Sequence, residues 1–237
     1  MERLDKIIAG QCGLTRSQAR SRIWAGAVAV DGVTERAIDR KVDASAQSIT
    51  LDRQPLCYRK YLYIMMNKPM GCVSASRDRE ERTVIDLLPQ EWKRSGVAPA
   101  GRLDKDTEGL LILTDDGDFA HRLISPRKGV YKTYIARLDR PADEAAVKAF
   151  ADGLVLVDGE KCLPAKLEFT QDPNTVRIRI CEGKYHQVKR MCAAVGCHVE
   201  ALRRVSIGSL KLDESLAPGE SRLLTEEEMD KLLSGSR

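Results

Sequence analysis

The chain has 237 residues and a formal net charge of +4, with 43% hydrophobic and 31% charged residues. This composition is typical of a soluble globular protein, and the length allows one large domain or one medium and one small domain. No apolar run reaches the roughly 20 residues that cross a bilayer, and the N-terminus lacks the apolar stretch of a secretory signal. We therefore expect a cytoplasmic protein with no membrane contact.

Seven cysteines are scattered along the chain, at positions 12, 57, 72, 162, 181, 192 and 197. An odd number without regular spacing argues against a disulfide framework. The three histidines, at 121, 186 and 198, do not join the cysteines at the spacing of zinc ligands. We expect reduced cysteines and no metal site.

The sequence predicts a small α/β domain over residues 1–56. Apolar residues recur at helical spacing between residues 2 and 9. Thr15 and Gln18 have the pattern of a capping box, so a second helix is expected to begin at Thr15 and to stop at Gly26. Alternating valines and an Asp-Gly turn at 31–32 then predict a β-hairpin.

The second predicted helix carries Arg16, Arg20 and Arg22 and no acidic residue. Arg16 and Arg20 are one turn apart and share a face of the helix. A solvated surface is the ordinary explanation of such a charge run. The alternative is a face that contacts the phosphate groups of a nucleic acid.

Residues 57–237 form the second predicted domain, which follows a linker at residues 54–60. Strand-like and helix-like segments do not alternate strictly here, which favours a mixed, mainly antiparallel sheet with flanking helices, an α+β fold. The expected strands are 61–66, 110–113, 131–138, 165–169, 175–180 and 206–212, and the expected helices are 144–151, 185–195 and a short one capped at Thr225.

A dense set of charges precedes the apolar run at 110–113. Asp104, Asp106 and Glu108, with Asp115 at the twelfth position, match much of an EF-hand calcium loop. Position twelve is normally Glu, however, and the segment before Asp104 is a poor helix. A glycosidase would also use paired carboxylates, but 5% aromatic residues leave few sugar platforms. The plain alternative is an exposed, salt-bridged turn.

Two distant segments change this interpretation. Lys132 and Tyr134 stand at the start of an expected strand. Residues 182–191 run from the end of a strand into a helix, on which Lys189 or Arg190 can point back toward the sheet edge.

Together, these segments resemble the motifs of a single protein family. Three motifs resemble, in chain order, those of the pseudouridine synthases: Gly101-Arg102-Leu103-Asp104, Lys132-x-Tyr134 and His186-Gln187-Val188-Lys189-Arg190-Met191. Asn67-Lys68-Pro69-x-Gly71 matches the strand end that opens their catalytic domain. Residues 107–117 are similar to the RsuA-like branch of the family, which acts on ribosomal RNA, and residues 1–56 resemble the S4 RNA-binding domain.

The resemblance implies isomerisation of a uridine, in which the glycosidic bond breaks and a carbon–carbon bond forms at C5 of the base. Nothing is oxidised and no group leaves, so no cofactor is expected. Asp104 is the expected catalytic carboxylate, Lys189 the cation that keeps it ionised, and Tyr134 the ring that stacks on the target base. The residues expected to contact RNA are Arg102, Arg16, Arg20, Arg22, Lys132, His186, Gln187 and Arg190.

The sequence is most similar to the small-subunit branch, so the expected partner is 16S ribosomal RNA or an assembly intermediate of the small subunit, and the expected form is a monomer. Modification of 23S RNA stays open. So does a non-catalytic RNA-binding or ribosome-assembly protein, although such a protein is expected to have lost Asp104, Tyr134 or the cation at 189, and this chain keeps all three.

Overall fold

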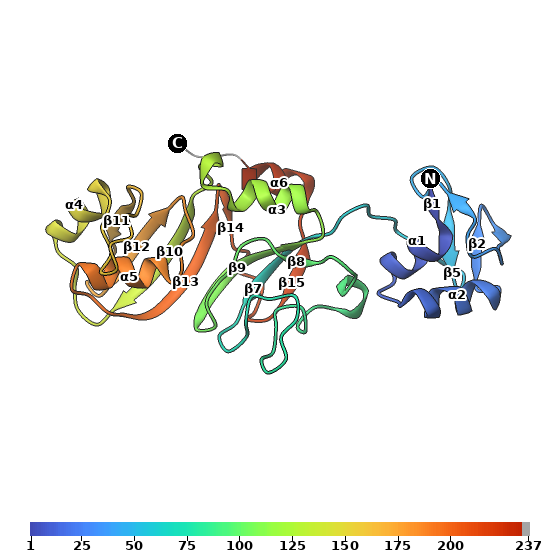
Figure 1. Ribbon diagram of the computed structural model, residues 1–237, viewed down its shortest axis with the longest axis horizontal. Coiled ribbons are helices and arrows are strands. Elements are labelled where there is room, and N and C mark those ends of the chain that lie inside the picture. Colours follow the sequence, from blue (N-terminus) through green and yellow to red (C-terminus); the bar gives the residue numbers. More distant parts are fainter. Residues whose placement is uncertain (234–237) are drawn as a thin grey trace. The chain divides into compact units, whose positions relative to one another are not determined.

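The computed structural model describes residues 1–233, and its contacts divide the chain into two compact units. The first unit comprises residues 1–62 together with 88–97, and the second comprises 63–87 and the chain from 98 onward. Figure 1 shows the elements of both units. The sequence placed a boundary after residue 56, whereas this grouping keeps 57–62 in the first unit and adds a later segment. The assignment of these units as functional domains stays a prediction.

Two helices and small sheets make up the first unit. The helices are α1 (Leu4–Gln11) and α2 (Arg16–Trp24). One sheet has the order β3 (Val33–Thr34), β2 (Val28–Val30), β5 (Ile49–Leu51), β6 (Gln54–Pro55), and β1 (Glu2–Arg3) pairs with β4 (Lys41–Val42). The Thr15 hydroxyl accepts a hydrogen bond from the backbone N–H of Gln18 at 3.2 Å, and the backbone N–H of Thr15 donates to the Gln18 side-chain oxygen at 2.8 Å. The predicted capping box is therefore confirmed.

The segment 88–97 belongs to this first unit through specific contacts. Arg94 is buried and donates hydrogen bonds to the carbonyl oxygens of Arg59 and Lys60, at 3.0 and 3.3 Å. The short 3-10 helix η1 (Gln90–Trp92) lies against Gly13, where an added Cβ would overlap the carbonyl oxygen of Gln90. Gly13 has a positive φ of 62°, which also favours glycine.

The second unit is built on a nine-stranded sheet with the order β11-β12-β10-β13-β9-β7-β15, to which β8 and β14 add at β9 and β13. All its strand pairs are antiparallel except β13 with β9. The predicted mixed, mainly antiparallel sheet is therefore confirmed. The strands are β7 (Tyr63–Lys68), β8 (Ala98–Pro99), β9 (Thr107–Thr114), β10 (Lys132–Leu138), β11 (Lys166–Phe169), β12 (Thr175–Ile180), β13 (Val199–Ile207), β14 (Leu210–Lys211) and β15 (Ser221–Leu223).

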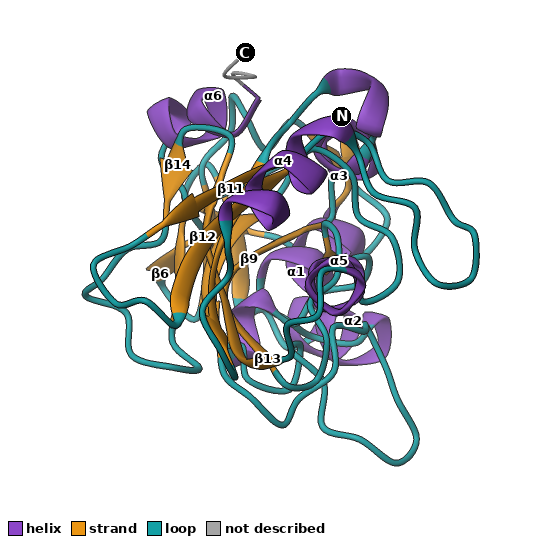
Figure 2. Ribbon diagram, turned by 90° about the vertical axis from the view of Figure 1, so that its left-hand side faces the viewer, coloured by secondary structure: helices purple, strands orange, loops and turns teal. Residues whose placement is uncertain are grey.

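Helices flank this sheet, as the views in Figures 1 and 2 show. They are α3 (Gly117–Ile124), η2 (Pro126–Lys128), α4 (Glu144–Asp152), α5 (Gln187–Ala194) and α6 (Glu226–Leu233). Helix α5 packs on β13, α4 on β11, and α3 contacts α6. Over residues 1–233, none of the helices has the length and apolar character that crossing a membrane requires.

Two expectations about this unit differ from the structure. The strand expected at 206–212 is wrong, because β13 ends at Ile207 and the chain turns at Gly208, with a positive φ of 57°, before β14. Helix α3 was not among the expected helices. Asp116 caps this helix by accepting a hydrogen bond from the backbone of Phe119 at 3.0 Å.

Candidate active site

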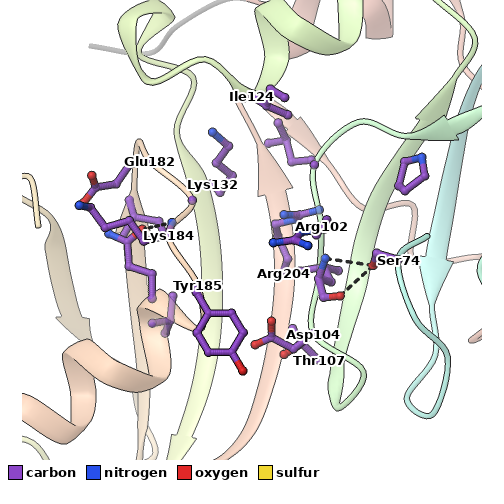
Figure 3. A pocket seen from close by; sticks show the side chains of 18 of the residues that line it. Ser74, Arg102, Asp104, Thr107, Ile124, Lys132, Glu182, Lys184, Tyr185 and Arg204 are labelled. Carbon is purple, nitrogen blue, oxygen red and sulfur yellow. Dashed lines mark hydrogen bonds between the residues drawn. The ribbon is translucent and has the colours of Figure 1, made fainter. Parts of the chain in front are cut away.

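A cavity of about 950 Å³ opens in the second unit. Figure 3 shows Arg102, Asp104 and Thr107 on one side of it and Glu182, Lys184 and Tyr185 on the other. Its lining comes from segments that are far apart in the sequence, namely 73–75, 99–107, 121–126, 132–134, 180–188 and 202–207. Cavities of this kind are the usual position of enzyme active sites.

Neighbouring strands supply the wall between these two sides. Tyr134 on β10 lies opposite Arg204 on β13, and Thr107 on β9 lies opposite Leu202 on β13. Alternate residues of a strand share a face, so Lys132 points to the same side of the sheet as Tyr134. All five residues line the cavity.

The backbone around Asp104 is held by residues of an earlier segment. Lys68 is fully buried and donates to the carbonyl oxygens of Asp104 and Thr107, each at 2.9 Å. The Ser74 hydroxyl donates to the carbonyl oxygen of Leu103 at 2.8 Å and accepts from its N–H at 3.0 Å, as Figure 3 shows. These bonds fix the position of the Asp104 backbone.

The carboxylate of Asp104 faces two basic side chains. Its Oδ2 lies 3.5 Å from Lys189 Nζ, and its Oδ1 lies 3.6 Å from His186 Nε2. Lys189 Nζ lies closer to Asp106 Oδ1, at 2.5 Å. The hydrogen bond from Lys189 outweighs partial burial and lowers the pKa of Asp106. Lys189 is therefore shared between the two aspartates, and Asp106 contributes more to the site than the sequence indicated.

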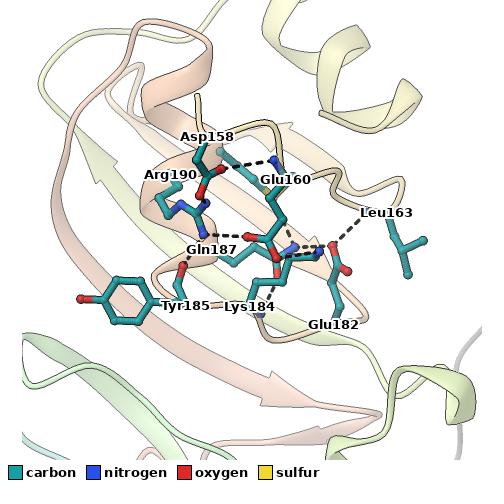
Figure 4. A network of polar contacts seen from close by, with 9 residues as sticks. Asp158, Glu160, Leu163, Glu182, Lys184, Tyr185, Gln187 and Arg190 are labelled. Carbon is teal, nitrogen blue, oxygen red and sulfur yellow. Dashed lines mark hydrogen bonds and ion pairs between the residues drawn. The ribbon is translucent and has the colours of Figure 1, made fainter. Parts of the chain in front are cut away.

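The loop before α5 is held by the polar network of Figure 4. Arg190 forms ion pairs with Asp158 and with Glu160, at 2.9 Å from the latter, and donates to the carbonyl oxygen of Tyr185 at 3.1 Å. Lys184 also pairs with Glu160, at 3.0 Å. The hydrogen bonds from Lys184 and Arg190 lower the pKa of Glu160.

Gln187 and His186 complete this loop. Gln187 is buried, donates to Glu182 at 2.6 Å and accepts from the backbone of Lys184 at 3.0 Å. His186 has a left-handed φ of 44°, which is rare for a residue other than glycine, and its ring stacks on Tyr185 with centroids 3.8 Å apart. The surrounding network holds His186 in this conformation, with its ring toward Asp104.

These contacts bear on two residues that were expected to contact RNA. The polar partners found for Gln187 and Arg190 belong to the protein itself, so both side chains shape the loop that presents His186. Their contact with RNA stays a prediction.

Tyr134 lies beside a buried arginine that the sequence reasoning missed. Arg204 is 3% exposed, donates from Nε to the carbonyl oxygen of Leu110 at 2.8 Å, and lies 3.4 Å from the Tyr134 hydroxyl through Nη1. One signal could have revealed it. The strand here was expected to begin only at residue 206, whereas β13 begins at Val199. Buried and exposed positions alternate imperfectly along it, and Arg204 falls on the buried face with Val199 and Leu202.

The basic residues of α2 lie in the other unit and have acidic partners. Arg16 and Arg20 pair with the buried Asp5 at 2.7 and 3.1 Å, and Arg22 pairs with Asp52 at 3.3 Å. Burial raises the pKa of Asp5, but hydrogen bonds and charge from the arginines around it outweigh burial and leave that pKa below its usual value.

The calcium-loop alternative is wrong. Residues 107–114 form the extended strand β9, which lies between Asp104 and Asp115 in the chain and is itself roughly 25 Å long at the usual rise of a strand. Twelve residues of this shape do not surround one ion. Across residues 1–233, no cluster of three or more His, Cys, Asp or Glu side chains has the arrangement of a metal site.

A family model described as RNA pseudouridylate synthase matches residues 62–194, more than half of the chain. The chain belongs to the RNA pseudouridine synthase family. The matched segment contains Asp104, Tyr134 and Lys189, whereas Arg204 lies beyond it.

Relatives in this family match nearly the whole chain. A Bacillus subtilis protein named uncharacterized RNA pseudouridine synthase YtzG is 46% identical, over 97% of this chain and 98% of its own length. Ribosomal small subunit pseudouridine synthase A of Escherichia coli is 45% identical, over 96% of this chain and 98% of its own length. The protein of the same name from Haemophilus influenzae is 42% identical, over 98% of this chain and 99% of its own length. The crystal structure of a pseudouridylate synthase, 40% identical, superposes with a TM-score of 0.69 and covers 98% of this chain and 100% of that one.

Proposed function

We propose that this synthase converts a uridine of 16S ribosomal RNA to pseudouridine. One observation carries the proposal: Asp104 lies in the large cavity with Lys189 beside it and Tyr134 in the adjoining wall. Relatives 45% and 42% identical are named for the small ribosomal subunit, which favours 16S over 23S RNA. We also propose that the enzyme acts as a monomer in the cytoplasm, where ribosomal subunits assemble.

Asp104 would act on the bond between ribose and base. A carboxylate can assist this step as a nucleophile, or by stabilising positive charge that develops on the ribose. Lys189 and His186 supply the positive or hydrogen-bonding surroundings, at 3.5 and 3.6 Å. Lys68 and Ser74 hold the backbone, so the carboxylate needs little reorganisation during the reaction.

The target base would have to leave its stack in the RNA to reach this cavity, which costs a few kcal/mol in enzymes that modify bases. We propose that Tyr134 stacks on the base, which its position in the cavity lining supports. Arg102 is exposed and also lines the cavity, and we propose that it occupies the space that the base leaves behind.

We further propose that the first unit binds RNA as an S4-like domain. The side chains of Arg16, Arg20 and Arg22 remain 47%, 44% and 55% exposed despite their ion pairs. An arginine held by a carboxylate on one side keeps further N–H groups for a phosphate. A non-catalytic RNA-binding protein would share this face, but it would not need the buried supports around Asp104.

The test is Asp104→Asn, which removes the charge and keeps the size of the side chain. The variant is expected to bind small-subunit RNA with near-unchanged affinity, because phosphate contacts dominate affinity, and to form no pseudouridine. Pseudouridine mapping of both ribosomal RNAs, with parallel binding measurements, checks this.

Asp115→Asn is the matched control, since it makes the same change outside the cavity and is expected to leave activity intact. Normal turnover by Asp104→Asn would contradict the role of Asp104. Modification confined to 23S RNA would contradict the small-subunit assignment.

A further inference from the structure

Two buried cations in the cavity wall lack a carboxylate partner. Lys132 is 7% exposed and Arg204 is 3% exposed. The titratable groups that act on Lys132 are Arg204 and Cys181, neither of which is a carboxylate. Within residues 1–233, Nη2 of Arg204 has no hydrogen-bond partner. The one other buried side-chain polar atom without a partner in that part of the chain, Thr107 Oγ1, belongs to the same wall. Buried charge without compensation is expensive, so such groups mark places where a ligand completes the structure.

The electrostatics of the wall increase the cost of leaving these two cations without an acceptor. Burial, and then the charge of Arg204, lower the pKa of Lys132 to about 8. The acidic side chains nearby are engaged elsewhere, because Glu182 accepts from Gln187 and from the backbone of Leu163. Asp104 faces Lys189 and His186 instead. The wall therefore needs an acceptor that the protein does not supply.

The chemistry of a flipped nucleotide indicates which acceptor enters. A flipped nucleotide places its base deepest in the pocket and leaves its phosphates at the mouth, and the base is read by hydrogen bonds to its edge. Lysine and arginine are donors only, and the acceptors on the edge of uracil are its carbonyl oxygens. Figure 3 shows Lys132 and Arg204 within the cavity. Lys132 shares strand β10 with Tyr134, and Arg204 lies opposite Tyr134 on β13.

We infer that Lys132 and Arg204 form a subsite for the carbonyl oxygens of the target uracil and stabilise the negative charge that those oxygens take up when the base is detached. This inference rests on the proposed function. When the bond from ribose C1′ to N1 breaks, both electrons leave with the base, and its negative charge spreads from N1 onto the two carbonyl oxygens. C5 then bonds to C1′, C5 loses its proton and N1 gains one, so the reaction needs no oxidant. Donors fixed in a water-poor site act strongly on such developing charge.

Lys132→Met tests this subsite, with Lys148→Met as the matched loss of an exposed lysine on α4. We expect Lys132→Met to slow single-turnover pseudouridine formation at saturating RNA by about 100-fold, the effect of removing one such donor. The affinity for RNA should stay near that of the wild type. The Tm should rise, since an unpaired buried charge has been replaced by an apolar side chain. Lys148→Met is expected to change none of these.

A pH profile separates the charge of Lys132 from its shape. Because its pKa is about 8, Lys132 is charged below that pH and neutral above it, so kcat/KM of the wild type should fall above pH 8. Lys132→Arg keeps its charge and should lack this fall. The other charged or titratable groups of the cavity are the same in both proteins, namely Arg204, Arg102, Asp104, Lys105, Glu182, Lys184, Tyr185, His186, His121 and Tyr134, with Cys181 close by.

Three outcomes would overturn the inference. The first is a wild-type rate in Lys132→Met. The second is a loss confined to RNA affinity with a weaker salt dependence, which would identify a phosphate contact. The third is a lower Tm, which would identify a structural role. If the wild-type protein modified neither ribosomal RNA, the proposed function itself would be overturned. That result is distinct from a failure of the subsite inference, because it is seen with the wild type before any variant is compared.

Discussion

At the scale of single residues, the placement of Asp104 depends on a side chain 36 positions away in the chain. Lys68 stands at the end of β7, is fully buried, and donates to four carbonyl oxygens, those of Pro69, Asp104, Lys105 and Thr107. Burial lowers the pKa of its ammonium group, which nearby acidic groups partly offset. Lys68 thus braces the loop that carries Asp104, and its own side chain is buried.

Lys68→Met is expected to lower the single-turnover rate by about 100-fold, since a displacement of about 1 Å at a catalytic group has effects of that size. It should also lower the free energy of unfolding by about 1–3 kcal/mol, because buried carbonyl groups lose their donor. Rate measurements and urea denaturation check both effects. Lys211→Met, on an exposed position of β14, is the control, and equal behaviour of the two variants would contradict the bracing role.

At the scale of elements, the parallel pair β9–β13 brings the two halves of the cavity together. It sets Thr107 opposite Leu202 and Gly109 opposite Arg204. Gly109 has a positive φ of 103°, and a Cβ there would overlap the backbone of Arg204. Only glycine allows this approach without strain, so the position of Arg204 depends on the absence of a side chain on β9.

Gly109→Ala is therefore expected to destabilise the second unit by more than about 3 kcal/mol, from backbone strain together with a direct overlap, and to abolish pseudouridine formation. Gly117→Ala is the control, because its added Cβ meets no atom within 4 Å at the start of α3. Its stability should change little or rise slightly, since alanine favours a helix. Chemical denaturation of both variants checks this, and a stable, active Gly109→Ala protein would refute the packing argument.

At the scale of the whole molecule, the two units have separate hydrophobic cores, which indicates two cooperative folding units. One core contains Leu4, Ile8, Ile23 and Val28, and the other contains Met65, Leu110, Ile112 and Phe119. The segment 88–97 joins the first unit although it lies within the sequence of the second. The first unit therefore needs residues 57–62 and 88–97, which a simple cut between residues 56 and 57 would separate from it.

Differential scanning calorimetry should accordingly resolve two transitions. Ile23→Ala and Ile112→Ala each empty a fully buried site and are expected to cost about 2–5 kcal/mol. Ile23→Ala should lower one transition by about 10 °C or more, and Ile112→Ala should lower the other. A single transition that both variants shift equally would show that the units fold as one.

The sequence by itself determined those features of the fold and of the site that depend only on residues close together in the chain. The capping box at Thr15, the strands β10 and β12, and helix α4 follow from local pattern, and three contiguous motifs sufficed to place the chain in its family and to indicate Asp104. Such features are local because capping, side-chain alternation and loop chemistry involve residues within one or two turns of each other.

Only the tertiary structure decided which distant side chains complete the site. Lys68 reaches Asp104 across 36 positions, Arg204 reaches Tyr134 across 70, and Lys189 reaches Asp106 across 83. The bounds of β13 and α3 were also missed, because the register of β13 is set by β9 and β10 rather than by its own residues. A local pattern does not determine these contacts, since sheet register and burial arise when strands from far apart in the chain pair.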